Sequence, residues 1–228
     1  MKTCLSVALL SVVLLAGCRD REAEAAAQAA AQAAASEAAA DEAARAFEAA
    51  VADGNWALAK AQGDLLFAQW PTSDAAARVR EQYEEAKAKG HAETEARRVA
   101  ALWIYQTQPV KGGEQLSAAI YARDELDVDG SGAKPVRLIF RDHPDWGRSA
   151  YLVLEAGDFD CYTGCRLKVS ADGKVHTLPG SRPKTDEAIA MFIDDHKALW
   201  KLAKGAKTLT IEFPVKGYGK KTAVFETA

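Results

Sequence analysis

The hydrophobic pattern of the chain begins with helical character. Residues 21–52 carry long alanine runs, interrupted by Gln28, Gln32 and Ser36 at a spacing of four residues. Alanine has the highest helix propensity of all residues, and the spacing places these polar side chains on one helix face. A helix of about 31 residues would be roughly 45 Å long. The segment predicts a stiff spacer or an alanine-rich coiled coil with another chain, and the small alanine side chain favours the spacer.

A short helical hairpin is predicted over residues 53–98. Asp53-Gly54-Asn55 interrupts the first helix, and Pro71 ends the second. Thr72-Ser73-Asp74 supplies a cap for a third helix, which Gly90 is expected to end. The hydrophobic positions that share a face are Trp56, Ala59, Leu66 and Trp70 in the second helix and Ala76, Val79, Tyr83 and Ala86 in the third.

Residues 99–228 change to the alternation of β-strands. Val136, Leu138 and Phe140 occupy every second position of one such segment, a pattern typical of half-buried antiparallel strands. One helix, capped by Thr185 and closed by Gly205, is expected among them. The fold class is therefore α+β: a long alanine-rich helix and a helical hairpin, followed by an antiparallel β-sandwich or strongly bent sheet with one packed helix. The predicted strands cover residues 102–108, 116–123, 135–141, 150–155, 166–170, 208–213 and 222–226.

The charge of the chain excludes one class of function. The 228 residues include 29 Lys and Arg and 32 Asp and Glu, for a net charge of −3. Nucleic-acid binding depends on a positive surface that neutralises phosphates. We therefore expect no nucleic-acid partner.

The first residues have the composition of an export signal. The apolar run 5–15 follows Lys2 and is shorter than the roughly 20 residues that span a bilayer. It leads into Leu15-Ala16-Gly17-Cys18, which resembles the lipobox of bacterial lipoproteins. The resemblance implies that residues 1–17 are a signal peptide cleaved before Cys18, and that lipid on Cys18 makes the membrane a partner. Several acyl chains on one residue anchor a protein stably.

The residues after Cys18 bear on which membrane holds the protein. In Gram-negative lipoproteins an Asp directly after the modified cysteine retains the protein in the inner membrane. Here that residue is Arg19, and Asp20 comes one position later. The resemblance therefore implies the outer membrane, facing the periplasm. Sorting rules differ between bacteria, so the inner membrane stays open as an alternative.

The segment from Gly54 resembles tetratricopeptide-type repeats. Trp56-Ala57 follows its start, and Pro71, Ser73 and Ala75 lie in its linker. The resemblance implies paired helices. A solenoid needs about three repeats, so we expect a helical pair rather than a repeat array.

Two cysteines remain outside the signal peptide and the lipidation site. The export signal places Cys161 and Cys165 in an oxidising compartment, where such a pair favours a disulfide. Gly164 suits a left-handed turn position between them. The redox motif has two residues between its cysteines, and a zinc site needs about four ligands, so we expect a structural disulfide and no metal site.

No set of catalytic residues stands out in the sequence. His91, His143, His176 and His196 lack the spacing of paired ligands, and we expect a packed role for His196 on its helix. The acidic turn at residues 125–130 lacks the later carboxylate that a calcium loop requires. We expect no cofactor and no enzymatic activity.

Two aromatic residues in predicted turns are the binding candidates. Trp146 lies between Pro144-Asp145 and Gly147-Arg148, and Tyr218 lies between two glycines. Interfaces draw their anchors from aromatic residues on loops. The alternative, that each side chain caps a sheet edge, stays open.

The sequence thus favours an envelope lipoprotein whose β-domain is a non-enzymatic binding or accessory module for an unknown periplasmic protein or envelope ligand. One alternative is an immunity or inhibitor lipoprotein that neutralises a periplasmic toxin or hydrolase. Another is a cell-wall or glycan hydrolase.

Overall fold

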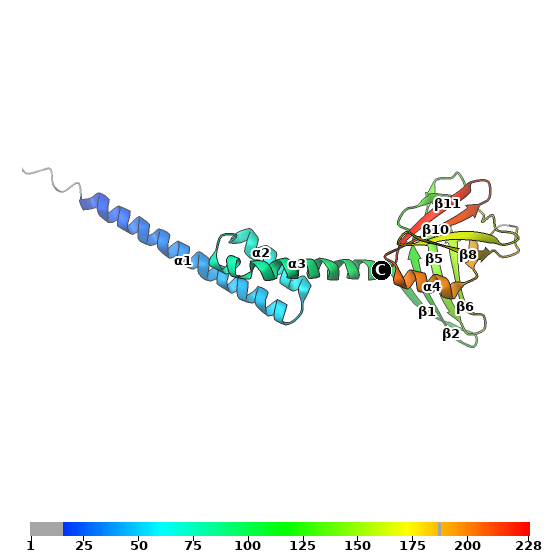
Figure 1. Ribbon diagram of the computed structural model, residues 1–228, viewed down its shortest axis with the longest axis horizontal. Coiled ribbons are helices and arrows are strands. Elements are labelled where there is room, and N and C mark those ends of the chain that lie inside the picture. Colours follow the sequence, from blue (N-terminus) through cyan, green and yellow to red (C-terminus); the bar gives the residue numbers. More distant parts are fainter. Residues whose placement is uncertain (1–15, 187) are drawn as a thin grey trace, which may run out of the picture. The chain divides into compact units, whose positions relative to one another are not determined.

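The structure is a computed structural model that describes residues 16–186 and 188–228, with side chains from residue 21 onward. The predicted signal peptide up to residue 15 and the Cys18 side chain lie outside this part. The chain divides into unit 1, which ends at Thr94, and unit 2, Glu95–Ala228. Figure 1 follows the chain from the helices to the sheet. Helices and one large antiparallel sheet confirm the α+β fold class.

Polar residues mark the starts of the second and third helices of the chain. The helices are α1 (Ala16–Ala52), α2 (Trp56–Gln69) and α3 (Asp74–Ala100). The Asn55 side chain caps α2 by accepting a hydrogen bond from the backbone N–H of Leu58. Ser73 Oγ accepts from the backbone N–H of Ala76 at 3.0 Å, ahead of α3. Local polar residues therefore position these helix starts.

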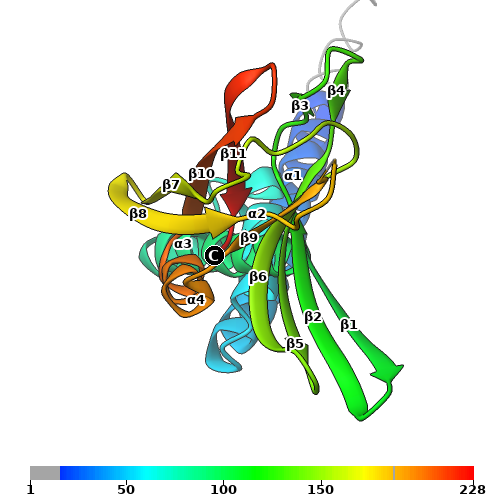
Figure 2. The same ribbon diagram turned by 90° about the vertical axis from the view of Figure 1, so that its right-hand side faces the viewer.

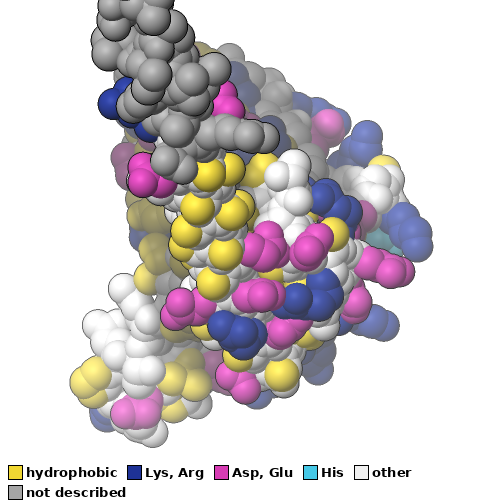
Figure 3. All heavy atoms as spheres, turned by 90° about the vertical axis from the view of Figure 1, so that its left-hand side faces the viewer, with side chains coloured by type: hydrophobic (Ala, Val, Ile, Leu, Met, Phe, Trp, Pro, Cys, Tyr) yellow, Lys and Arg dark blue, Asp and Glu magenta, His cyan; other side chains and the backbone are white. Residues whose placement is uncertain are grey.

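The first half of α1 is exposed to solvent. Every residue from 21 to 36 is exposed, whereas Ala40, Ala44 and Phe47 farther along the helix are completely buried. Figure 3 shows a band of hydrophobic side chains next to the grey residues, where the alanines of α1 begin. This half of the helix depends on the propensity of alanine, because it buries no apolar face. Within the described residues, no helix is long and apolar enough to cross a bilayer.

Tyr83 is at the centre of the core of unit 1. Its ring lies 4.5 Å from the Phe67 ring and 6.4 Å from the Phe47 ring, measured between centroids. Its hydroxyl donates a hydrogen bond to Asp64 Oδ1 at 2.5 Å. Gly63 of α2 faces this ring, and a Cβ there would lie 2.3 Å from Tyr83 Cδ2. The missing side chain at Gly63 lets α2 and α3 pack closely.

Replacing Gly63 with alanine is expected to destabilise unit 1. Alanine gains about 1 kcal/mol over glycine in helix propensity, but overpacking a fixed core costs about 1–3 kcal/mol. The Tyr83 ring is held by two aromatic neighbours and a hydrogen bond, so the clash should outweigh the propensity. Chemical denaturation followed by far-ultraviolet circular dichroism measures the change. Gly205→Ala is the control, because a Cβ there meets open space; equal stability of the two variants would contradict the expectation.

Gly90 does not end α3, so this prediction was wrong. The helix continues to Ala100. A Cβ at Gly90 would lie 2.6 Å from the Trp56 carbonyl oxygen and 2.8 Å from Lys60 Cβ. Glycine serves the close approach of α2 at this position, and that reason is invisible in the local sequence.

Unit 2 contains a nine-stranded sheet in the order β1-β2-β5-β6-β9-β8-β7-β10-β11, and a separate pair formed by β3 and β4. All the predicted strands are present, whereas β3, β4, β8 and β9 were not predicted. The strands are β1 (Trp103–Val110), β2 (Gly113–Tyr121), β3 (Leu126–Asp127), β4 (Ala133–Lys134), β5 (Val136–His143), β6 (Gly147–Leu154), β7 (Cys165–Ala171), β8 (Lys174–Ser181), β9 (Ala190–Ile193), β10 (Thr208–Val215) and β11 (Gly219–Glu226).

The sheet is strongly bent, which decides between the two predicted architectures. Figure 2 shows β1, β2, β5 and β6 running side by side in one direction, while β7, β8, β10 and β11 run in a different direction. The helix α4 (His196–Gly205) lies against the inner face and contacts β6, β7 and β10. Leu138 pairs with Leu152, and Leu152 with Met191, across β5, β6 and β9. These buried side chains form the core together with Leu199 of α4.

The predicted start of this helix was wrong. The Asp195 side chain caps α4 by accepting from the backbone N–H of Ala198 at 2.9 Å. Residues 190–193, which were expected to be helical, form β9 between β6 and β8. Strand pairing on both sides outweighs the helical spacing of these few hydrophobic residues.

Candidate ligand-binding groove

A groove of about 410 Å³ opens between the start of α4 and the ends of β1, β2, β5 and β6. Tyr105, Leu116 and Phe140 line it from the strands, and Lys197 and Trp200 line it from α4. All of these residues belong to unit 2. The volume falls within the range of small-molecule sites, about 300–1,000 Å³.

Strand register explains why the groove forms at this place. Successive inward positions of β5 carry Val136, Leu138 and Phe140, and the next inward position carries Asp142. Asp142 pairs with Leu116 of β2 and with Arg148 of β6. The apolar core therefore ends at Phe140, while the strands extend beyond it. The inner face past that point stays open.

Aromatic rings form the apolar floor of the groove. The Phe140 ring lies 4.7 Å from the Trp200 ring in an edge-to-face arrangement, and the Trp103 ring lies 6.2 Å from Phe140. Farther out, Tyr105 is 70% exposed and Leu116 is 50% exposed. Contiguous exposed apolar side chains mark interaction sites on soluble domains.

The rim of the groove carries basic side chains. Arg148 Nε donates to Asp142 Oδ2 at 2.8 Å, and both side chains are exposed. Lys197 is exposed and forms no ion pair with any residue that the structure describes. The Arg141 guanidinium lies over the Trp146 and Tyr151 rings at 5.2 and 5.4 Å, on the opposite face of the sheet. The inner rim thus has two cations and one carboxylate, in addition to the half-buried His196.

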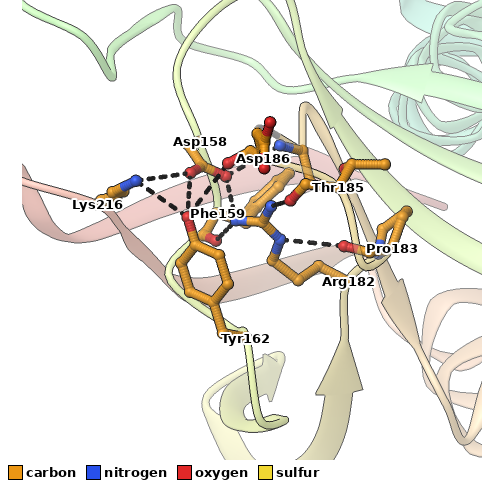
Figure 4. A network of polar contacts seen from close by, with 9 residues as sticks. Asp158, Phe159, Tyr162, Arg182, Pro183, Thr185, Asp186 and Lys216 are labelled. Atoms are coloured by element: carbon orange, nitrogen blue, oxygen red, sulfur yellow. Dashed lines mark hydrogen bonds and ion pairs between the residues drawn. The ribbon is translucent and has the colours of Figure 1, made fainter.

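A second cluster of polar side chains is closed rather than open. Figure 4 shows Arg182 reaching the carboxylate of Asp158, with the ring of Tyr162 beside it. The Arg182 and Asp158 side chains are 1% and 9% exposed. Arg182 also donates to the carbonyl oxygens of Phe159 and Thr185. These bonds tie the loop before β7 to the loop after β8.

The remaining lone pairs of Asp158 are also used. Asp158 Oδ1 accepts from the Ala188 backbone N–H at 3.0 Å, and Oδ2 accepts from the Tyr162 hydroxyl at 2.8 Å. Burial alone would raise the pKa of Asp158, but the hydrogen bonds and Arg182 together lower it below its usual value. The two buried side chains, Arg182 and Asp158, have their partners within the cluster, so we assign it a structural role.

The predicted cysteine pair lies at disulfide distance. The Cys161 and Cys165 Sγ atoms are 2.13 Å apart, and the Cα atoms are 5.1 Å apart. Gly164 adopts the expected left-handed conformation, with φ of +88°. The pair closes the loop that also contains Tyr162, next to the buried cluster. Among the described residues, no group of three or more His, Cys, Asp or Glu side chains is placed to hold a metal ion.

The two predicted binding residues lie in different turns. Trp146 lies in the β5–β6 turn, is 69% exposed and stacks on His143 with ring centroids 4.0 Å apart. Tyr218 lies in the β10–β11 turn, and its hydroxyl donates to the Asp129 carbonyl oxygen at 2.6 Å. Figure 2 places these turns at opposite ends of unit 2. The structure does not bring them into one site, and their role in binding stays a prediction.

The groove residues were missed by the sequence patterns. Two residues could have indicated the groove. Asp142 of β5 and Arg148 of β6 are charged, although the other inward-facing residues of these strands are apolar. His196 was expected to have a packed role on its helix. His196 is half-buried and lines the groove instead.

Comparison of the chain with protein-family models, with curated proteins and with solved structures finds no match.

Proposed function

We propose that the chain is a lipid-anchored protein of the cell envelope whose unit 2 binds a ligand without transforming it. The observation that carries this proposal is the groove, which combines an aromatic floor with a basic rim at the open end of the sheet. Ligand sites of binding proteins are concave and mostly apolar, with a few polar groups that orient the ligand. The groove has this composition.

The rest of the chain supports a tethered binding module. The lipobox sequence at Cys18 supplies an anchor, and the exposed half of α1 supplies a stiff spacer next to it. The outer membrane, facing the periplasm, is the proposed location because Arg19 follows Cys18. The partner is an envelope component, and no nucleic acid is involved.

The groove lining favours binding over catalysis. Ser117 and Ser149 pair with Arg141 across β2, β5 and β6, so their hydroxyls lie on the face of the sheet opposite the groove. Nucleophilic catalysis requires a hydroxyl within hydrogen-bond reach of a base such as His196. Within the described part of the chain, His196 forms no hydrogen bond with either serine. A binding role needs no such pair.

In-cell photo-crosslinking tests the proposal. A photo-reactive amino acid at Leu116, on the groove wall, is expected to capture an envelope component after irradiation. The matched control is Val175, which is comparably exposed on β8 and does not line the groove. Mass spectrometry of the adduct then identifies the captured molecule.

The outcomes separate the competing functions. Capture at Leu116 and not at Val175 supports the binding module. Equal capture at both positions, or at neither, contradicts it. A specific adduct with a periplasmic toxin or hydrolase would support an inhibitor instead. Turnover of cell-wall material by the purified protein would replace the binding module with a hydrolase.

A further inference from the structure

We infer that the ligand of the groove is a small amphipathic anion, namely a carboxylate carried on an acyl chain or an aromatic ring. This inference rests on the proposed function and names the ligand class for the same site. It follows from three properties of the groove: its volume, its floor and the sign of the charge at its rim.

The volume limits the size of the ligand. A water molecule occupies about 30 Å³ of liquid, so 410 Å³ holds about 14 water-sized groups. A twelve-carbon carboxylate has that many non-hydrogen atoms. A membrane lipid with two long chains would leave much of its apolar surface outside the groove, so the groove suits a single-chain amphiphile.

The aromatic floor of the groove favours a ligand with an apolar chain or ring. Phe140 and Trp200 present ring surfaces at the base, and Leu116 and Tyr105 form the outer wall. Burying apolar surface contributes about 25 cal/mol for each square ångström removed from water. The ligand part that rests here gains affinity through area and needs no hydrogen bonds.

The charged side chains at the rim of the groove favour one sign of charge at the polar end of the ligand. Arg148 lies on β6 at one side of the groove, and Lys197 lies on α4 at the other. The nearby carboxylate of Asp142 already accepts from Arg148 Nε, while Lys197 has no ion-pair partner among the described residues. A ligand carboxylate would supply the missing negative charge next to Lys197. A ligand cation would face two like charges instead.

A titration with charge-matched amphiphiles tests the inference. The full mature chain with Cys18→Ser, which requires no detergent, is titrated calorimetrically with dodecanoate and with dodecyltrimethylammonium below their micellar concentrations. Both probes have the same chain, so the comparison isolates the charge. We expect dodecanoate to bind at least tenfold more tightly.

Charge reversal at the rim provides the matched comparison. The double variant Arg148→Glu/Lys197→Glu should invert the preference between the two probes. Lys168→Glu is the control, because Lys168 is exposed on β7 on the face opposite its buried neighbours. That variant should keep the preference of the parent chain. If the double variant fails to fold, the two probes compared on the parent chain still decide the question.

The outcomes distinguish this inference from the proposed function. Equal affinity for both probes, or tighter binding of the cation, overturns the anionic assignment but leaves the groove as an apolar site. Failure of both probes to bind, with specific capture still observed at Leu116, overturns the small-amphiphile class alone. Failure of the probes together with failure of capture at Leu116 overturns both.

Discussion

Replacing Arg182 with alanine is expected to lower the free energy of unfolding of unit 2 by about 3–5 kcal/mol, the usual cost of leaving one partner of a buried ion pair uncompensated. The Arg182 guanidinium is almost fully buried and neutralises Asp158. Its removal also breaks the hydrogen bonds from the guanidinium to the carbonyl oxygens of Phe159 and Thr185. Chemical denaturation of the full mature chain, with hydrogen exchange measured on peptides of unit 2, gives the change.

A surface pair serves as the control for this prediction. Lys220 donates to Glu212 at 2.8 Å, and the lysine side chain is well exposed. Exposed ion pairs contribute about 0–1 kcal/mol, so Lys220→Ala should hardly change the stability. If Arg182→Ala behaved like the control, the cluster would not hold the loops of unit 2 together.

The loss of stability at acidic pH provides a second test of the ion pair between Arg182 and Asp158. The pKa of Asp158 is lower in the folded protein than its ordinary value of 3.8. The folded state therefore binds fewer protons, and the stabilisation is present above about pH 4 and is lost as the pH falls through the folded pKa. Without Arg182, burial would raise this pKa, so acid unfolding of the variant should begin at a higher pH.

Replacing Cys18 with serine is expected to abolish acylation of the protein. Lipid attachment in the lipobox requires the thiol, and the anchor depends on several acyl chains at one residue. Metabolic labelling with a clickable palmitate analogue should give a strong band for the parent chain and none for the variant. Fractionation should find the parent in membranes and the variant released or retained as precursor.

Cys4→Ser is the control for the proposed anchor, because Cys4 lies in the proposed signal peptide, ahead of the proposed cleavage site. Labelling of this variant should equal that of the parent chain. Equal labelling of Cys18→Ser and the parent would refute the lipidation site and, with it, the proposed tether.

The sequence by itself determined the features that depend on neighbouring residues. Alanine propensity predicted α1, Asn55 and Ser73 marked the starts of the next two helices, and alternation located the strands of β5 and β10. The pairing of Cys161 with Cys165 was likewise local, because only a short turn separates them. In each case the interacting groups lie within a few residues of one another, so their spacing carries the information.

Only the tertiary structure decided the features that depend on partners far along the chain. Residues 190–193 became a strand because β6 and β8 lie on either side, and Gly90 stayed within α3 because Trp56 approaches it. The same holds for the groove, whose floor combines Phe140 of β5 with Trp200 of α4. Arg148 and Lys197 face one opening although many residues separate them. Periodicity reports which side of an element a residue occupies, whereas register and packing determine what that side meets.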